Sequence, residues 1–460
     1  MNFYFEAAKT LDRLNAKQGS VKSVLSTLPD KDRKRTAALV IETLKYKSAL
    51  TDVIVASRLL EEERKITSRS LALVLVHDVL LSKGIQAGDG PIKQAILRHK
   101  TRLHAEFIKI KIKNGAKANI ELAQTGDARA EQMPRYVRVN TLKTSLEETI
   151  KSYVSKGYEI GDPLQAKKFA KDQHIPDLLL FPPQTQFHED LAYTSGRIIL
   201  QDKASCFPAT VLAPPARDDC VVIDATAAPG NKTSHLSALM QNKGKLFAFE
   251  RDRRRFSTLK TMLDKAGCRN TEALNIDFLT TNPEDIQFAE VTHILLDPSC
   301  SGSGIVNRLD HLLEPEEVSQ ENLEGRLNKL SSFQLMMIRH AMKFPSVQKI
   351  VYSTCSIHAI ENEHVVQEAI NSAEARTGAF KLASPDMVLP NWHRRGLPDK
   401  LSNPVDAAAL VRCSPGEDAT NGFFVSCFKR RVMEGSGDNA LFEQGKGRRH
   451  KKRKTKAGNA

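Results

Sequence analysis

The sequence contains none of the cysteine patterns that mark a disulfide framework or a structural zinc site. Its seven cysteines are odd in number and widely spaced, and no two of them form a C-x-x-C pair. We therefore expect free thiols, a reducing compartment and no bound metal. The cysteines lie at positions 206, 220, 268, 300, 355, 413 and 427.

Long apolar runs are also missing. The longest extends from Leu71 to Leu81, is interrupted by His77 and Asp78, and is shorter than the roughly 20 residues that cross a bilayer. The amino-terminal stretch carries acidic residues and has neither the apolar segment nor the small-residue cleavage site of a secretory signal. We therefore predict no membrane segment and no secretory signal.

The chain carries an excess of positive charge. Its formal net charge is +14, and the last fifteen residues contribute eight Lys or Arg and no acid, which leaves +6 on the rest. We predict that residues 432–460 form a disordered basic tail that acts as a nuclear-import signal or contacts nucleic acid; a merely solvated terminus is the alternative. The overall charge favours a polyanionic partner.

The first part of the chain has a helical pattern. A chain of 460 residues is too long for one ordinary hydrophobic core, so we expect two or three domains. Residues 1–125 are predicted to be helical, because apolar side chains recur every three or four positions, for example between Leu39 and Leu50. The helix that begins near Pro91 has a basic face, which either contacts nucleic acid or is simply solvated.

A small α/β module is predicted over residues 133–205. Residues 135–143 alternate in polarity as a strand does, and residues 145–160 have the pattern of a helix followed by a strand. Pro214 and Pro215 mark a boundary after it.

From residue 218 onward, short apolar runs alternate with helical stretches, which is typical of a parallel α/β sheet. These elements belong to one predicted domain, residues 206–431. We also predict a late strand over 422–431 that completes the sheet at its edge. The other predicted strands lie within 220–226, 245–250, 272–277, 291–297 and 349–355.

Four of these predicted strands end in an acid: Asp224, Glu250, Asp277 and Asp297. Ligands of open parallel sheets bind beyond the carboxyl ends of the strands. One strand-end acid is commonly a helix cap or a turn former, and for Asp277 this alternative stays open. Four such acids on one edge indicate a binding site.

The loop after the first of these strands, DATAAPGNKT, has the composition to bring backbone close to a ligand. Gly230 supplies permissive backbone and Pro229 restricts the turn. Neither G-x-G-x-x-G nor a P-loop is present, which weakens a dinucleotide or nucleoside-triphosphate interpretation. Glu250 lies where a carboxylate accepts hydrogen bonds from ribose hydroxyls. A nucleoside-containing ligand without a pyrophosphate is the simplest fit.

Three motifs on alternating strands carry a family resemblance: DATAAPGNKT, DPSCSGSG and YSTCSIHAIENE. With the blocks YVRVNTLK, QDKASCFPA and GFFVSCFKR, they make residues 133–431 similar to the Nol/Sun (RsmB-like) family of RNA cytosine carbon-5 methyltransferases. Ser299, Asn231 and the helical amino-terminal region look most similar to the subfamily that modifies large-subunit ribosomal RNA. Thr226 departs from the family, which usually has a cysteine there; it is expected to contact the cofactor without reacting.

The resemblance implies a Rossmann-like class I methyltransferase domain with a mostly parallel seven-stranded sheet. The helical domain precedes it, and the small α/β module is implied to recognise RNA. The resemblance also implies S-adenosyl-L-methionine as the cofactor, RNA as the partner, and a nuclear, more narrowly nucleolar, location in ribosome biogenesis. A monomer is expected.

Methylation of cytosine at carbon 5 poses a chemical problem, because this carbon is too weak a nucleophile to attack a methylsulfonium. A thiolate that adds to carbon 6 activates the ring, an acid group beside nitrogen 3 stabilises the developing charge, and a base then removes the carbon 5 proton so that the thiol leaves. The resemblance implies Cys355 as the nucleophile, Asp297 beside nitrogen 3 and the exocyclic amine, and Cys300 in product release. Lys232 is implied to support Asp297 or the proton transfer.

The resemblance also places the cofactor over the loop that precedes the second helix of this domain. Glu250 is implied to contact its ribose, with Arg255 nearby, Asp277 near its adenine and Asp297 below its methyl group. The loop residues implied in cofactor binding are Thr226, Ala227, Ala228, Pro229, Gly230, Asn231 and Lys232.

Other residues have simpler interpretations. The remaining cysteines are expected to be buried, and the histidines at 293, 340, 358 and 364 have no metal-like or triad-like spacing. Trp392, beside Arg394 and Arg395, either stacks on a base or packs in the core.

Alternative functions also remain open. A catalytically idle RNA-binding assembly factor and a transfer RNA cytosine methyltransferase are the two alternatives. An amino-group methyltransferase is disfavoured, because it needs Asp/Asn-Pro-Pro-Tyr/Phe where this chain has Asp297 followed by Pro-Ser-Cys.

Overall fold

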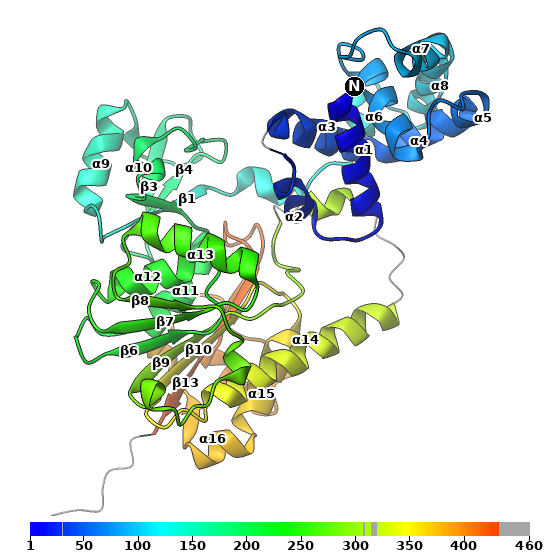
Figure 1. Cartoon of the computed structure of the whole chain (residues 1–460). Helices are drawn as coiled ribbons and strands as arrows, with labels where there is room; N and C mark the ends of the chain where they lie inside the picture. Colours follow the sequence, from blue (N-terminus) through cyan, green and yellow to red (C-terminus); the bar gives the residue numbers. More distant parts are fainter. Residues whose placement is uncertain (30, 307–308, 314–319, 432–460) are drawn as a thin grey trace, which may run out of the picture.

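The computed structural model describes residues 1–29, 31–306, 309–313 and 320–431 (Figure 1). The predicted basic tail, 432–460, lies outside these residues. The chain begins with a bundle of helices, as the spacing of apolar residues predicts. Its elements are α1 Asn2–Asn15, α2 Val21–Ser26, α3 Arg33–Lys45, α4 Lys47–Ala56, α5 Leu59–Glu62, α6 Arg69–Leu81, α7 Pro91–Arg98, α8 Lys100–Lys113, and the 3₁₀ turns η1 Asn119–Leu122 and η2 Ala128–Gln132.

The longest apolar run of the sequence is the central helix of this bundle. α6 begins after Ser68, whose side chain accepts a hydrogen bond from the Leu71 amide at 3.1 Å. Its residues 70–80 are all buried, and it packs against α1, α3, α4 and α8. Among the described residues, no helix is long and apolar enough to cross a membrane.

The small module is a five-stranded sheet in the order β2-β3-β4-β1-β5. β1 lies inside it, because it pairs antiparallel with both β4 and β5. Tyr153 packs against Phe169, Phe181 and Phe187 in an aromatic core. The elements are β1 Arg135–Val139, α9 Leu146–Ser155, β2 Glu159–Ile160, β3 Lys168–Lys171, β4 Leu178–Phe181, α10 Leu191–Thr194 and β5 Ile198–Leu200.

The carboxyl-terminal domain has three layers, with helices on both faces of a sheet. The strand order is β11-β13-β10-β9-β6-β7-β8, and β12 pairs beside β13. The pairs from β10 through β9, β6 and β7 to β8 are parallel. Helices α11, α12 and α13 cover one face, and α14, α15 and α16 cover the other (Figure 1). This confirms the predicted Rossmann-like sheet, with seven strands in the main path and β12 as an addition.

The bounds of this domain's elements follow the predicted alternation of strand and helix. The strands are β6 Val221–Asp224, β7 Lys245–Phe249, β8 Thr271–Leu274, β9 Val291–Leu296, β10 Lys349–Thr354, β11 Phe380–Leu382, β12 Val411–Cys413 and β13 Phe423–Arg430. The helices are α11 Lys203–Leu212, α12 Asn231–Leu239, α13 Arg253–Ala266, α14 Gln320–Ala341, α15 Glu363–Ile370 and α16 Ala373–Thr377.

β13 is not the edge strand that the sequence pattern predicts. It pairs antiparallel with β10 on one side, and with β11 and β12 on the other. Its first six residues are buried. A strand buried on both faces is apolar almost throughout, and the segment FFVSCF has that composition.

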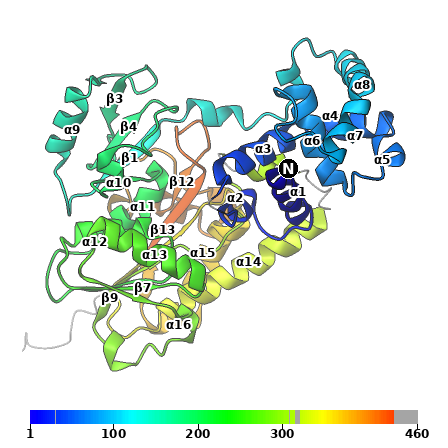
Figure 2. The ribbon, with the colours of Figure 1, turned by 45° about the horizontal axis from the view of Figure 1, so that its top comes forward.

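Contacts of the 3₁₀ turn η5 and of Arg138 help to attach the other parts of the chain to this domain. The 3₁₀ turn η5, Leu309–Leu312, packs against α2 and α3, and Leu312 is 1% exposed within the core of the helical bundle. This turn is visible in yellow-green among the blue helices (Figure 2). Arg138 of β1 is buried and donates to Gln201 Oε1 and to Ser234 Oγ of α12, each at 2.8 Å. The turn η5 follows the carboxyl end of β9, and Ser234 lies on the helix that follows β6.

Candidate active site

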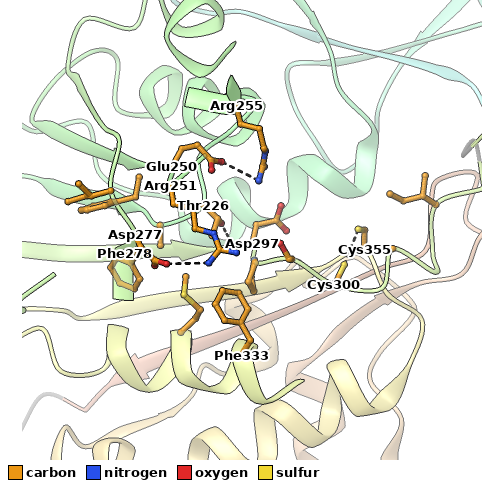
Figure 3. A pocket seen from close by; sticks show the side chains of 18 residues that line it. Thr226, Glu250, Arg251, Arg255, Asp277, Phe278, Asp297, Cys300, Phe333 and Cys355 are labelled. Carbon is orange, nitrogen blue, oxygen red and sulfur yellow. Dashed lines mark hydrogen bonds and ion pairs between the residues drawn. The ribbon is translucent and has the colours of Figure 1, made fainter. Parts of the chain in front are cut away.

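A cavity of about 330 Å³ lies at the carboxyl ends of the parallel strands (Figure 3). Loops that follow β6, β7, β8, β9 and β10 supply its wall, and Phe333 and Met337 of α14 close it. This is the edge at which open parallel sheets bind their ligands. Seven residues proposed from the sequence line it: Thr226, Glu250, Arg255, Asp277, Asp297, Cys300 and Cys355.

Glu250, directly after β7, presents a carboxylate to one end of this cavity. The residue is 5% exposed. Its Oε1 accepts the Asp252 amide at 2.8 Å, and its Oε2 lies 3.3 Å from Arg255 Nη1. Arg255 also donates to the carbonyl of Ala228 at 2.8 Å. The loops after β6 and β7 are thereby held together around a fixed acceptor group.

Asp277 both caps a short helix and lines the cavity. Its Oδ1 accepts the Leu279 amide at 3.0 Å, at the start of η3, Phe278–Thr280. Its Oδ2 lies 3.3 Å from Arg251 Nη1. The capping interpretation is therefore correct, and it does not exclude a contact between this carboxylate and a bound molecule.

The apolar lining beside Asp277 was not predicted from the sequence. Ile276, Phe278, Phe333 and Met337 form it, and apolar walls with a few polar groups are typical of sites for small organic ligands. Phe333 and Met337 are four residues apart on α14, so they share a helix face. Nothing in the sequence relates this face to the strand ends.

Most of the loop DATAAPGNKT lies behind the cavity wall. Thr226 lines the cavity, and its Oγ1 accepts the Asp297 amide at 3.0 Å. Gly230 has φ of +112°, and a β-carbon there would come within 3.3 Å of Leu259 and Met262, so this turn requires glycine. The other proposed loop residues do not line the cavity, and their contact with a cofactor stays a prediction. They are Ala227, Ala228, Pro229, Gly230, Asn231 and Lys232.

Asp297 forms an ion pair with Lys232. The Lys232 Nζ lies 2.7 Å from Asp297 Oδ2 and donates to Ser205 Oγ at 3.1 Å. Burial lowers the pKa of Lys232, but the carboxylate of Asp297 and the thiol of Cys355 outweigh it, and the net shift is upward. Ser353 donates to Asp297 Oδ1 at 2.7 Å. Sequence patterns gave no sign of Ser205 or Ser353 at this site.

Cys300 and Cys355 meet at the far end of the cavity from Glu250 (Figure 3). Their sulfur atoms are 3.1 Å apart, although the residues come from the loop after β9 and the end of β10. The hydrogen bond with Cys355 and burial hold the pKa of the Cys300 thiol well above its ordinary value. Cys300 therefore keeps its proton, and either sulfur can be the donor of the hydrogen bond between the two thiols.

The other five cysteines do not line the cavity. Burial raises the pKa of Cys206 to about 12 and that of Cys427 to about 11. Cys220 and Cys413 are also buried, and Cys268 is partly buried. This agrees with the interpretation of these cysteines as packing residues.

A buried network beneath the Cys300 loop, residues 297–306, was also missed by the sequence analysis. Glu361 is fully buried, and its carboxylate accepts the Ser301 amide at 2.9 Å and the Ser301 hydroxyl at 2.6 Å. It also accepts Gln334 Nε2 at 3.0 Å, and Gln334 donates to the Ser299 carbonyl at 3.1 Å. Glu361 thus fixes the backbone on both sides of Cys300. The motif IENE contains this glutamate, but its polarity alone suggests a surface position.

Trp392 packs in the core and does not present its ring for stacking on a base. It is 3% exposed, and its indole nitrogen donates to the Arg412 carbonyl at 2.7 Å. Within the described ranges, no group of three or more His, Cys, Asp or Glu residues is placed to hold a metal ion.

Comparisons with known proteins agree with this geometry. Residues 209–429 match the family described as 16S rRNA methyltransferase RsmB/F. Residues 34–123 and 133–201 match the N-terminal domain and the ferredoxin-like domain of NOL1/NOP2/Sun domain family member 5. The crystal structure of PH0851 is similar in fold, with a TM-score of 0.59 and 21% identity over 89% of this chain and 93% of that one.

Two curated relatives are similar over almost their whole length. The 25S rRNA (cytosine-C(5))-methyltransferase rcm1 of Schizosaccharomyces pombe is 44% identical over 427 residues, which covers 93% of this chain and 91% of that protein. The 28S rRNA (cytosine-C(5))-methyltransferase of Mus musculus is 42% identical over 441 residues, which covers 94% and 91%.

The sheet order and the cavity at its carboxyl edge define a class I methyltransferase. The identity to the curated relatives, over more than nine-tenths of their length, permits a narrower assignment. The chain belongs to the Nol1/NOP2/Sun family of ribosomal RNA cytosine-C5 methyltransferases. The resemblance inferred from the three motifs is confirmed.

Proposed function

We propose that this protein transfers a methyl group from S-adenosyl-L-methionine to carbon 5 of a cytosine in large-subunit ribosomal RNA, through a transient bond between Cys355 and carbon 6 of the base. The names of the relatives, 25S and 28S rRNA (cytosine-C(5))-methyltransferases, support the reaction and the substrate class. The observation that carries the mechanism is the 3.1 Å contact between the sulfurs of Cys300 and Cys355 beside Asp297.

The residues of the cavity fit the proposed cofactor. The buried carboxylate of Glu250 is an acceptor for two ribose hydroxyls. The apolar side chains of Ile276, Phe278 and Phe333 offer packing surface for adenine, with Asp277 beside them. When bound, the cofactor supplies an electrophilic methyl group. Asp297 lines the same cavity and completes the cofactor-binding set that we propose.

Activation of the cytosine is assigned to Cys355 and Asp297. Addition of the Cys355 thiolate to carbon 6 turns carbon 5 into a nucleophile. As the Cys355 sulfur adds to carbon 6, nitrogen 3 takes its proton from the carboxyl group of Asp297, which Ser353 holds in place. The resulting carboxylate then accepts hydrogen bonds from nitrogen 3 and from the exocyclic amine. Lys232, whose pKa is raised, stays protonated 2.7 Å away and balances the charge of the carboxylate.

Product release is assigned to Cys300. After methyl transfer, carbon 5 carries both the new methyl group and its original proton. Removal of that proton by a base re-forms the double bond between carbons 5 and 6 and expels the Cys355 sulfur. Cys300, which keeps its thiol proton, donates a hydrogen bond to the departing sulfur and so assists its release.

We also propose that the chain consists of three domains and a tail. We assign residues 1–125 to a helical domain, 133–205 to an RNA-recognition module, 206–431 to the methyltransferase domain and 432–460 to a basic tail. The protein is proposed to act as a monomer in the nucleolus during ribosome biogenesis. The nature of the substrate, ribosomal RNA, supports that location.

The adduct between enzyme and RNA tests the roles of the two cysteines. Cys300→Ala is expected to accumulate a covalent complex with substrate RNA, because release is slowed after Cys355 has added. Cys355→Ala is expected to form none, and Cys427→Ala, a buried cysteine outside the cavity, should behave as wild type. Denaturing gels of protein incubated with RNA and cofactor measure this. A complex formed by Cys355→Ala would instead assign the nucleophile to Cys300.

The substrate is tested separately. Bisulfite sequencing of ribosomal RNA from cells that lack the protein should reveal the loss of one methylated cytosine in the large-subunit RNA. Re-expression of wild type, but not of Cys355→Ala, should restore it. Unchanged ribosomal RNA together with a lost transfer RNA site would contradict the proposed substrate.

A further inference from the structure

A second cavity adjoins the first at the Cys300 loop. Its volume is about 640 Å³. Its walls come from the turn between α1 and α2, from the segment that leads into η2, from the Cys300 loop and from α14. Gly302 and Ile305 line both cavities, so the two cavities lie against the same loop. We call the second cavity the interdomain cleft.

The position of the interdomain cleft suits the proposed reaction. A base that is methylated within a structured RNA must leave its stack and enter the active site, while its flanking phosphates stay outside. Cys355 lies in the first cavity with Ile305, and Ile305 borders the cleft. The cleft therefore lies next to the cavity that holds Cys355, where the strand that flanks a bound base is expected to run.

The charges in the interdomain cleft suit a phosphate backbone. Lys17, Arg129 and Arg326 line it from three different segments, and all three are exposed. Among the described residues of the lining, Asp127 is the acid, and it accepts Arg129 Nε at 2.8 Å. The described lining thus holds three cations and one acid, and Arg and Lys are the side chains that most often contact phosphate.

The basic helix α8 is the competing surface, and it suits RNA less well. Arg102 is 2.8 Å from Glu62, and Lys109 is 2.8 Å from Glu106, just as Arg129 of the cleft is paired with Asp127, so ion pairing does not distinguish the two surfaces. Ile108 and Ile112 on the same helix are 55% and 74% exposed. Helix α8 contributes no residue to either cavity.

We propose that the interdomain cleft binds the RNA strand that flanks the target cytosine, with Lys17, Arg129 and Arg326 contacting its phosphates. This rests on the proposed function, because it takes RNA as the substrate. The helical amino-terminal domain then forms one wall of the RNA path and the Cys300 loop forms the other. RNA binding and the geometry of the catalytic loop are thereby coupled.

The test compares two triple variants with the same change in charge. Lys17→Ala, Arg129→Ala and Arg326→Ala are combined in the cleft variant. The control variant combines Lys243→Ala, Lys343→Ala and Lys381→Ala, exposed lysines remote from both cavities. The probe is large-subunit ribosomal RNA from cells that lack the protein.

The cleft variant should raise the KM for RNA at least about 10-fold, with kcat within about 2-fold of wild type and unchanged cofactor affinity, because each lost phosphate contact weakens binding and not chemistry. The slope of log affinity against log salt should fall by about 0.7 per lost contact, roughly 2 in all, on a single strand. The control variant should change neither quantity.

Two results would overturn the cleft assignment: equal losses in both variants, which would indicate only long-range charge, or wild-type RNA affinity in the cleft variant. A different result would contradict the proposed function. Wild-type protein that transferred no methyl group to this RNA would contradict it, whereas the cleft variant would still lose RNA affinity in an anisotropy measurement without cofactor.

Discussion

Asp224, the last residue of β6, is a buried acid outside the proposed reaction. It is 1% exposed, and Thr233 donates to its Oδ2 at 2.8 Å. Burial raises the pKa of Asp224 from 3.8 to about 6, although hydrogen bonds from Thr233 and the Thr226 amide lower it in part. Between pH 3.8 and about 6, the folded protein therefore keeps this carboxyl group protonated, whereas the unfolded chain has released the proton. The stronger proton binding of the folded state contributes fully to the free energy of unfolding below pH 3.8, and this contribution is lost as the pH rises through about 6.

Asp224→Asn should therefore stabilise the protein at pH 7.5, by less than the about 3 kcal/mol that the pKa shift represents. The amide avoids a buried charge and keeps an acceptor for Thr233, but its NH2 group faces the Thr226 amide, which Asp224 accepts at 3.3 Å. The gain should shrink toward zero near pH 4. Urea unfolding of both proteins at the two pH values measures it, with Asp218→Asn, an exposed acid, as the control. An equal difference at both pH values would contradict the titration of Asp224.

Sequence motifs identify reactive residues better than the residues that hold them. Cys300, Cys355, Asp297 and Lys232 were proposed from the sequence, and the structure brings them together from three segments. Ser353 was not proposed, because a serine inside a strand carries no signal of its partner. Its contact with Asp297 depends on the parallel pairing of β9 with β10.

Glu361 is the buried carboxylate that holds the Cys300 loop next to Cys300, so its substitution can loosen the loop there. Glu361→Gln removes the negative charge of this acceptor and turns the oxygen that accepts the Ser301 hydroxyl into an NH2 donor. A hydrogen bond to a charged group contributes about 1.5–3 kcal/mol, against about 1 kcal/mol for a neutral one, so the loop is held less firmly. We expect Cys300 to be displaced from Cys355, and methyl turnover to fall about 10-fold or more.

A merely structural role for Glu361 predicts a different outcome. If the carboxylate positions Cys300, Glu361→Gln should accumulate the covalent RNA complex to a level between those of wild type and Cys300→Ala, with unchanged cofactor affinity. Glu368→Gln, an exposed change on α15, is the matched control. Reduced thermal stability without any increase in the trapped complex would show that Glu361 only stabilises the fold.

At the scale of elements, the parallel strands and the existence of β13 were predictable, whereas the position of β13 in the sheet and the short strands β11 and β12 were not. Each parallel strand precedes a helix, so alternation along the chain reveals it. β13 pairs with β10, more than seventy residues earlier in the chain, and with two short strands of three residues each. Such short strands leave no periodic pattern, and for this reason β13 was placed at the edge.

At the scale of the whole molecule, the helical bundle and the sheet domain share a core that the sequence cannot indicate. The turn η5 lies almost three hundred residues from α2 and α3, yet Leu312 is 1% exposed among the apolar residues of the bundle. The same chain segment leads directly from the Cys300 loop. The bundle is thus attached to the sheet domain through the loop that carries a reactive cysteine.

Leu312→Ala tests whether this attachment serves catalysis. Loss of the buried side chain should weaken the docking of η5 against the bundle by about 2–5 kcal/mol. We expect a raised KM for RNA and slower adduct release, with cofactor affinity unchanged.

The control is Leu50→Ala, which removes the same side chain from a fully buried position within the bundle. Leu50→Ala should lower stability but leave the kinetics of the folded enzyme intact. The reason is that α4 contributes no residue to the lining of either cavity. If Leu312→Ala instead matched Leu50→Ala in every kinetic constant, the bundle would be a passive neighbour of the active site. If Leu312→Ala differed from Leu50→Ala in RNA binding and adduct release alone, η5 would be shown to link the helical bundle to the Cys300 loop.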